Sequence, residues 1–134
     1  MRALKFLTLL SSVIISLITH AALPPLSQED REAYASTIMT GVVVNMNMVA
    51  QKTGYRSVNN IYTVIFAPTN IEKGDMISRS VEFTFWKAAE RPDGWCGPTG
   101  QYGMMKVGDN IRVYMYKNEE NTYQLIEPNG FDKL

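Results

Sequence analysis

Residues 80–87 read SVEFTFWK, and their strict alternation of apolar and polar side chains decides the fold class. Successive side chains of a β-strand point to opposite faces, so Val81, Phe83 and Phe85 share one face and the polar residues between them share the other. Such alternation is typical of an antiparallel strand with one buried face and one face in water. We therefore predict a strand over Ser80–Lys87 whose apolar face lies in a core.

Strand patterns also occur on both sides of this segment. They comprise a long segment that begins at Thr37 and the shorter segments Asn60–Ala67, Asp109–Lys117 and Thr122–Glu127. In the long segment one parity is apolar throughout and is expected to face the core: Val42, Val44, Met46 and Met48. Gly41 lies near the start of that segment and predicts a bulge or a sharp bend.

A short helix and an irregular loop complete the pattern. Ser27 is placed to cap a helix over Gln28–Ala35, and residues 88–108 hold seven Gly or Pro residues and no periodicity. These elements predict a mainly β fold, a small five-stranded antiparallel barrel with a short N-terminal helix and a long Gly/Pro-rich loop between strands three and four. A two-sheet sandwich is the alternative. The 134 residues fit one domain, predicted over residues 22–134.

Several short segments carry a resemblance to a known family. They are Thr40–Val43, Lys73–Asp75, Val81–Trp86, Cys96-Gly97, Val107–Asp109 and Ile111–Tyr114. In the order of its elements the chain resembles an oligonucleotide/oligosaccharide-binding (OB) barrel, in particular the netrin-like or tissue-inhibitor-of-metalloproteinase-like branch of secreted OB barrels. That branch usually has several disulfides, and its protease inhibitors begin with a metal-chelating Cys. This chain has a single Cys, so the resemblance implies the fold and not protease inhibition.

The N-terminal segment predicts a signal peptide over residues 1–21. Arg2 and Lys5 give a positive start, residues 6–18 form an uninterrupted run of apolar and hydroxyl side chains, and Ala21 is a small residue at the cleavage position. A membrane-spanning helix is the alternative, but a bilayer needs about 20 apolar residues. We expect cleavage after Ala21 or one residue later, and an exported protein, periplasmic or secreted, without a stable membrane span.

Composition argues against several classes of function. The 13 Lys and Arg balance the 13 Asp and Glu, and removal of the signal peptide would leave a slight acidic excess, which argues against a nucleic-acid partner. The single Cys excludes an intramolecular disulfide and a Cys-based zinc cage. The only histidine, His20, lies in the predicted signal peptide, so no Ser–His or Cys–His arrangement remains. We expect neither an enzyme nor a cofactor.

The candidate ligand surface combines one face of the sheet with the long loop. In Asp109–Lys117 the apolar parity is expected inward and the other parity outward. The outward residues Trp86, Arg112, Tyr114 and Tyr116, together with Trp95 and Cys96 of the loop, are the predicted site. We expect this surface to bind a protein, peptide or glycan partner in the envelope or extracellular space. The alternative is that these rings lie under the loop or the N-terminal helix.

Two further functions stay open. A periplasmic Cu(I) carrier would use the thioethers of Met46 and Met48, two residues apart on one strand face, with Cys96 as a third ligand. Met46 and Met48 are expected to face the core rather than a ligand, and the only histidine would be lost with the signal peptide, so both points argue against copper binding. Methionine is also a common core residue. For Cys96 itself, a buried or half-buried small residue packed against Trp95 is expected, with an intermolecular disulfide or a redox role as alternatives. The other function is a structural subunit of an envelope assembly.

Overall fold

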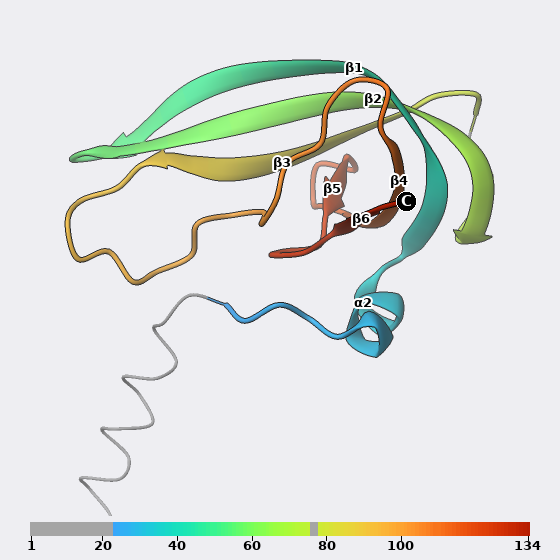
Figure 1. The fold of residues 1–134 in the computed structure, drawn as a ribbon, viewed down its shortest axis with the longest axis horizontal. Coiled ribbons are helices and arrows are strands. Elements are labelled where there is room, and N and C mark those ends of the chain that lie inside the picture. The colour runs from blue at the N-terminus through green and yellow to red at the C-terminus, as the bar shows by residue number, and fades with distance from the viewer. Residues whose placement is uncertain (1–22, 76–77) are drawn as a thin grey trace, which may run out of the picture.

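The structure is a computed structural model that describes residues 23–75 and 78–134 (Figure 1). Its elements are the helix α2 (Gln28–Tyr34) and the strands β1 (Thr37–Gly54), β2 (Ser57–Lys73), β3 (Val81–Glu90), β4 (Asn110–Lys117), β5 (Tyr123–Leu125) and β6 (Phe131–Lys133). The predicted signal peptide lies outside the described residues. Within 23–75 and 78–134, no helix has the length and apolar character that a bilayer crossing requires.

Five strands close into a barrel, as predicted. The hydrogen-bonded order is β1-β2-β3-β5-β4, and β1 also pairs with β4 to complete the ring. β6 pairs with the first half of β4, on the same edge where β5 pairs with its second half. β1 can serve both ends of the ring because it is long: residues 37–42 pair with β4, and the strand pairs with β2 from Ile38 to its end. The mainly β class and the closed five-stranded barrel are therefore confirmed, and the arrangement is consistent with an OB-like barrel.

The prediction that the barrel is purely antiparallel is wrong. β3 and β5 run parallel, with Phe83 opposite Tyr123 and Thr84 opposite Gln124. The reason is topological, because a closed ring with an odd number of strands cannot reverse direction at every neighbour. One parallel pair is the minimum that closure requires. It lies between the two strands that the β4–β5 hairpin and the long β3–β4 connection bring together.

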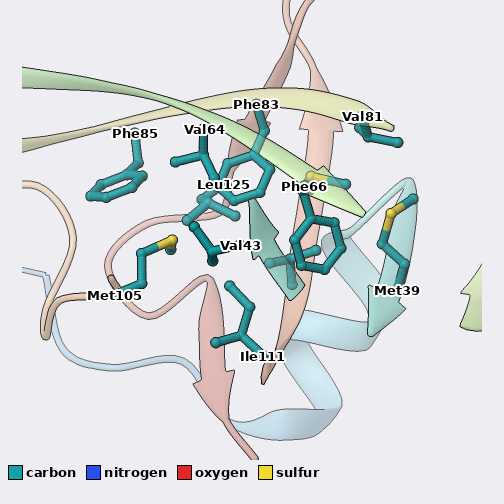
Figure 2. Close-up of a cluster of buried hydrophobic side chains, with 12 residues drawn as sticks. Met39, Val43, Val64, Phe66, Val81, Phe83, Phe85, Met105, Ile111 and Leu125 are labelled. Carbon is teal, nitrogen blue, oxygen red and sulfur yellow. The ribbon is translucent and has the colours of Figure 1, made fainter. Parts of the chain in front are cut away.

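The barrel interior is filled by the faces that the alternation in β3 and β4 predicts. Figure 2 shows Phe66 and Phe83 side by side in this core, with their ring centroids 5.8 Å apart in an edge-on arrangement. The buried cluster is Met39, Val43, Val64, Phe66, Val81, Phe83, Phe85, Met105, Ile111, Val113, Met115 and Leu125. The inward parity predicted for β3 and for β4 is thus confirmed.

The parity predicted for the first half of β1 is wrong. Val43 is 1 % exposed and belongs to the core, whereas Val44 is 52 % exposed. The pairing of β1 with β2 shifts between Val43 and Asn45, and after this bulge Met46 packs against the core. A bulge adds one residue to a strand and so exchanges its two faces. The sequence shows alternation on either side of Val44 but not the extra residue.

A second irregularity of β1 confirms the bend predicted at Gly41. The register with β2 shifts between Thr40 and Gly41, and a Cβ on Gly41 would lie 2.2 Å from the carbonyl oxygen of Ala67. Only a glycine permits this approach of the two backbones. The predicted strand Asn60–Ala67 stops before Pro68, but Pro68 lies opposite Gly41 at this irregularity and β2 continues to Lys73.

The β1–β2 hairpin extends well beyond the barrel. β4 pairs with β1 only as far as Val42, and the last backbone contacts on that edge join Val43 to Gly108 and Asp109. From Asn45 to the tip at Tyr55-Arg56, β1 is paired on one side only, by β2, which is paired in turn by β3. Figure 1 shows this three-stranded extension projecting from the closed ring.

The helix α2 packs against β4. The Ser27 hydroxyl accepts from the backbone N–H of Asp30 at 3.1 Å, which confirms the predicted cap. The buried Arg31 of this helix and a second small core hold α2 against β4. That second core consists of Ala35, Ile38, Tyr114 and Ile126, with Leu26 packed against it.

Candidate functional site

The six residues predicted from the sequence do not form one surface. Trp86 on β3 and Tyr116 on β4 lie on the outer face of the barrel and are partly exposed. Trp95 and Cys96 are exposed in the connection between β3 and β4. The remaining two, Arg112 and Tyr114, take part in the contact between β4 and α2.

Tyr114 is 0 % exposed and offers no surface to a ligand. Its ring lies between two guanidinium groups, with Arg31 at 4.4 Å and Arg112 at 4.9 Å from the ring centroid. The phenol oxygen accepts from Arg112 Nη1 at 2.6 Å and lies 3.4 Å from a carboxylate oxygen of Asp132. Burial raises the pKa of Tyr114, although both arginines oppose that shift. Tyr114 therefore fits the alternative in which a ring lies under the N-terminal helix.

Arg112 is held by carboxylates rather than left free for a ligand. Its Nε donates to Glu72 of β2 at 2.6 Å, and its Nη2 donates to Glu32 of α2 at 3.3 Å. Burial opposes the charged form, but the hydrogen bond and charge of Glu72, with Tyr114 and Glu32, outweigh it and raise the pKa of Arg112. The guanidinium thus joins α2, β2 and β4.

Trp86 is fixed on three sides. Its indole N–H donates to the Glu127 carboxylate at 2.5 Å. The isolated bridge at Gly100 lies against it, so that a Cβ on Gly100 would be 2.1 Å from the Trp86 carbonyl oxygen. The guanidinium of Arg91 lies 5.8 Å from the ring centroid. These contacts hold the indole in one position on the outer face of β3.

Tyr116 is joined to the same region through β5. Its hydroxyl donates to the side-chain oxygen of Gln124 at 2.8 Å, and burial together with the negative charge of Glu127 raises the pKa of Tyr116. Gln124 and Glu127 therefore connect the two predicted aromatic residues. Sequence analysis missed both of them, although the alternation in Thr122–Glu127 places Gln124 outward when Leu125 faces inward.

Two adjoining hollows run along the outer face of β3 and β5. The first, of about 200 Å³, is lined by Gln51, Asn59, Ile61, Thr84, Phe85, Trp86, Gln124, Leu125 and Glu127. The second, of about 500 Å³, is lined by Glu82, Thr84, Asn118, Glu120, Asn121, Thr122, Tyr123 and Gln124. Because Thr84 and Gln124 line both, the two hollows adjoin one another, and together we call them the outer groove. It extends from the β1–β2 hairpin to the β4–β5 loop.

The outer groove has a mixed polar and apolar lining with a slight acidic excess. Side-chain amides, which both donate and accept, come from β1, β2, β5 and the β4–β5 loop, and Glu82, Glu120 and Glu127 supply carboxylates. Ile61 and Trp86 lie side by side in the register of β2 with β3 and give the groove an apolar strip. Among the described residues that line it there is no Lys or Arg. Such a lining suits a neutral ligand with many hydroxyl or amide groups.

The connection from β3 to β4 is fastened at its start by two basic residues. Lys87 Nζ donates to the carbonyl oxygens of Gln101 and Gly103 at 2.7 Å each, and burial lowers the pKa of Lys87. Arg91 donates to Ser57 Oγ and to the carbonyl of Val58 at 3.1 Å each, and also to Asn59. The first turns of this connection are therefore tied to the hairpin extension.

Cys96 is exposed, so the expectation that it packs as a buried residue against Trp95 is wrong. Trp95 instead covers Gly97, where an added Cβ would lie 2.6 Å from the indole ring, and its indole N–H donates to the Pro98 carbonyl at 3.3 Å. The side chain that neighbours Trp95 from outside the turn is Arg91, 5.5 Å from the ring centroid.

The methionines of the alternative copper site lie on β1 beyond the bulge. Met46 packs against the barrel core and Met48 is exposed. Across residues 23–75 and 78–134, no group of three or more His, Cys, Asp or Glu side chains is arranged to hold a metal ion. That finding does not address thioether ligands, and copper binding stays a prediction.

Comparison with known proteins gave no relative: no family model, no curated protein and no solved structure matches this chain.

Proposed function

We propose that this protein is a non-catalytic binding module that holds a neutral glycan in the outer groove. The observation that carries the proposal is the adjacency of the two hollows, which share Thr84 and Gln124. Two hollows side by side on one face accommodate successive units of an elongated ligand better than a single compact ligand. In OB-type barrels the face of strands two and three and the loops beside it commonly bind oligosaccharides or oligonucleotides.

The chemistry of the lining favours a glycan over a nucleic acid. Phosphate recognition depends on Lys and Arg, whereas the residues described along the groove contribute amides, hydroxyls and carboxylates. Planar amides and carboxylates can bond pairs of neighbouring hydroxyl groups, because each offers two polar atoms in fixed geometry. The strip formed by Ile61 and Trp86 supplies an apolar surface for the less polar face of a sugar ring.

The groove is ordered by contacts within the protein. Glu127, Arg91 and Gly100 fix Trp86, and Tyr116 fixes Gln124. Binding then loses less side-chain freedom than it would at a surface of mobile side chains, which favours affinity. Export to the periplasm or beyond, expected from residues 1–21, would place the groove where envelope or extracellular glycans occur. The netrin-like resemblance and a peptide partner remain finer expectations.

The test is isothermal titration calorimetry with a panel of short neutral oligosaccharides, including β-1,4-linked glucose and N-acetylglucosamine chains. We expect binding by at least one of them, and at least about a tenfold loss of affinity in Gln124→Ala and in Asn59→Ala, since each loses hydrogen bonds to the ligand. Gln28→Ala removes an exposed amide on α2, away from the groove, and should bind as the wild type does.

If no oligosaccharide in the panel binds, but a member of an extended peptide library binds and depends on the same groove residues, the ligand is a peptide and not a glycan. Equal affinities for the wild type and both groove variants would remove the outer groove as the binding surface.

A further inference from the structure

The free edge of β1 is the most unusual surface of the molecule. Between Asn45 and Lys52 the register with β2 is unbroken, and beyond Val43 no backbone partner among the described residues occupies the other edge of β1. An edge of this length presents a row of N–H and C=O groups without backbone partners to any strand of matching shape. Protein edges are usually blocked by proline, several charges or a covering loop. This segment has no proline, and its only charged residue is Lys52.

The hydrogen bonds identify which backbone groups face outward. The N–H groups of Met46 and Met48 do not bond to β2 but donate to the side chains of Asn45 and Asn47, at 2.9 and 3.0 Å. Since the direction of N–H groups alternates along a strand, the N–H of Ala50 and that of Lys52 point to the same free edge. Even-numbered residues therefore offer the donors and acceptors of an unused antiparallel ladder.

Exposed apolar side chains concentrate along this edge. Val49 is 60 % exposed and Tyr55, at the hairpin tip, is 78 % exposed. Val44 and Met48 are also exposed, and so is Val107, whose neighbour Gly108 donates to the Val43 carbonyl where the edge begins. Because Met48 and Val49 point to opposite faces of the strand, these apolar residues flank the edge itself on both faces and mark it as an interaction site.

We propose that β1 pairs with β1 of a second copy of this chain, antiparallel and with Val49 opposite Val49 of that copy. The outer face carries an apolar row in which Val49 lies beside Ile61 and Ile61 beside Trp86. Pairing about Val49 places this apolar row next to the same row of the second copy, so that apolar side chains continue across the contact between the two chains. Cross-strand pairs of β-branched residues stabilise a sheet.

The same register is favourable at every other position of the edge. Asn47 lies opposite Gln51 of the second copy, so two amides meet, and Met48 lies opposite Ala50. Lys52 lies opposite Met46 and never opposite its own twin, which avoids like-charge repulsion. The tip residue Tyr55 reaches the end of the partner's edge, where Val44 and Val107 are exposed. The two outer grooves would then lie on one continuous sheet, although the pairing does not depend on what the grooves bind.

The experiment measures the mass in solution of the protein expressed from the full sequence, by light scattering and analytical ultracentrifugation, against the mass of one chain from mass spectrometry. We expect the wild type to be a dimer. Ala50→Pro removes one outward N–H and no bond to β2, so it should raise the dimer dissociation constant by about tenfold or more while the far-ultraviolet circular dichroism is unchanged.

Charge variants test the register. Val49→Lys and Val49→Glu each place two like charges opposite one another and should be monomeric, whereas an equimolar mixture of the two should give a heterodimer. Val49→Thr keeps the β-branched shape without charge and should remain a dimer. A monomeric wild type, or Ala50→Pro or Val49→Lys proteins that stay dimeric, would overturn the proposal.

Discussion

The two ends of the β1–β2 hairpin differ although they are parts of the same strands. At the barrel end, β1 is paired on both sides, and Val43, Val64 and Phe66 lie in the core. In the extension, β1 is paired on one side, and Val49 and Tyr55 are exposed. The bulge at Val44 separates the two. The comparison teaches that one long strand can supply a core in its first half and an exposed, singly paired edge in its second half.

The largest effect should come from a matched pair of aromatic truncations. Phe83→Ala leaves a cavity in the barrel core and should lower the free energy of unfolding by about 3–5 kcal/mol. Tyr55→Ala removes an exposed ring at the tip of the extension and should change it by less than about 0.5 kcal/mol. Both are measured by urea denaturation in the Val49→Lys background, which is expected to be monomeric. Similar losses of unfolding free energy in the two variants would show that the extension unfolds together with the barrel core.

A smaller effect is expected where the β3–β4 connection meets Trp86. Gly100 has φ +82° and its Cβ would lie 2.1 Å from the Trp86 carbonyl, so Gly100→Ala should cost about 2 kcal/mol of unfolding free energy and shift the tryptophan fluorescence. Gly94→Ala is the control, because Gly94 has φ +77° but open space around its Cβ position. It should cost about 1 kcal/mol. Equal costs would mean that backbone strain, and not the contact with Trp86, accounts for Gly100.

The smallest effect concerns the ionisation of Tyr116 at high pH. Burial and the charge of Glu127 raise its pKa in the folded state above the usual value of about 10. Below that value the phenol is neutral in both states, and above it the unfolded chain loses the proton first. Stability should therefore fall as pH rises through about 10, and Tyr116→Phe should remove that part of the fall, by less than about 1 kcal/mol because the ring is partly exposed.

This dependence is measured by urea denaturation at several alkaline pH values. Tyr114, whose pKa burial also raises, leaves a residual slope in the variant. An unchanged slope in Tyr116→Phe would place the titration of the wild type elsewhere.

Local patterns in the sequence were sufficient for α2 and the five strands of the barrel, but β6 was not predicted. The alternation in 80–87 predicts the inward face of β3, Ser27 predicts the start of α2, and Gly41 predicts the bend in β1, because each depends on neighbouring residues only. The bulge at Val44 could not be predicted, since an extra residue in a run of valines leaves no sign in composition. The continuation of β2 through Pro68 depends on the distant Gly41.

The candidate site was less predictable because it is made by pairing between distant segments. Trp86 was selected as an outward aromatic residue, but its partner Glu127 is 41 residues away in sequence. Gln51, Asn59 and Gln124 reach the outer groove through the hairpin and the parallel pair of β3 with β5. Tyr114 follows the outward parity that the alternation gives, yet α2 covers it, and nothing in a single strand's pattern shows which face receives a helix.

The parallel contact of β3 with β5 has a consequence for what a ligand would do. It consists of two residue pairs, fewer than any other junction of the ring, and the outer groove lies directly over it. A molecule that bonds to Thr84 on one side and Gln124 on the other would bridge the barrel at its least connected joint. A bound ligand would then stabilise the closed barrel, so that the free energy of unfolding rises with ligand affinity.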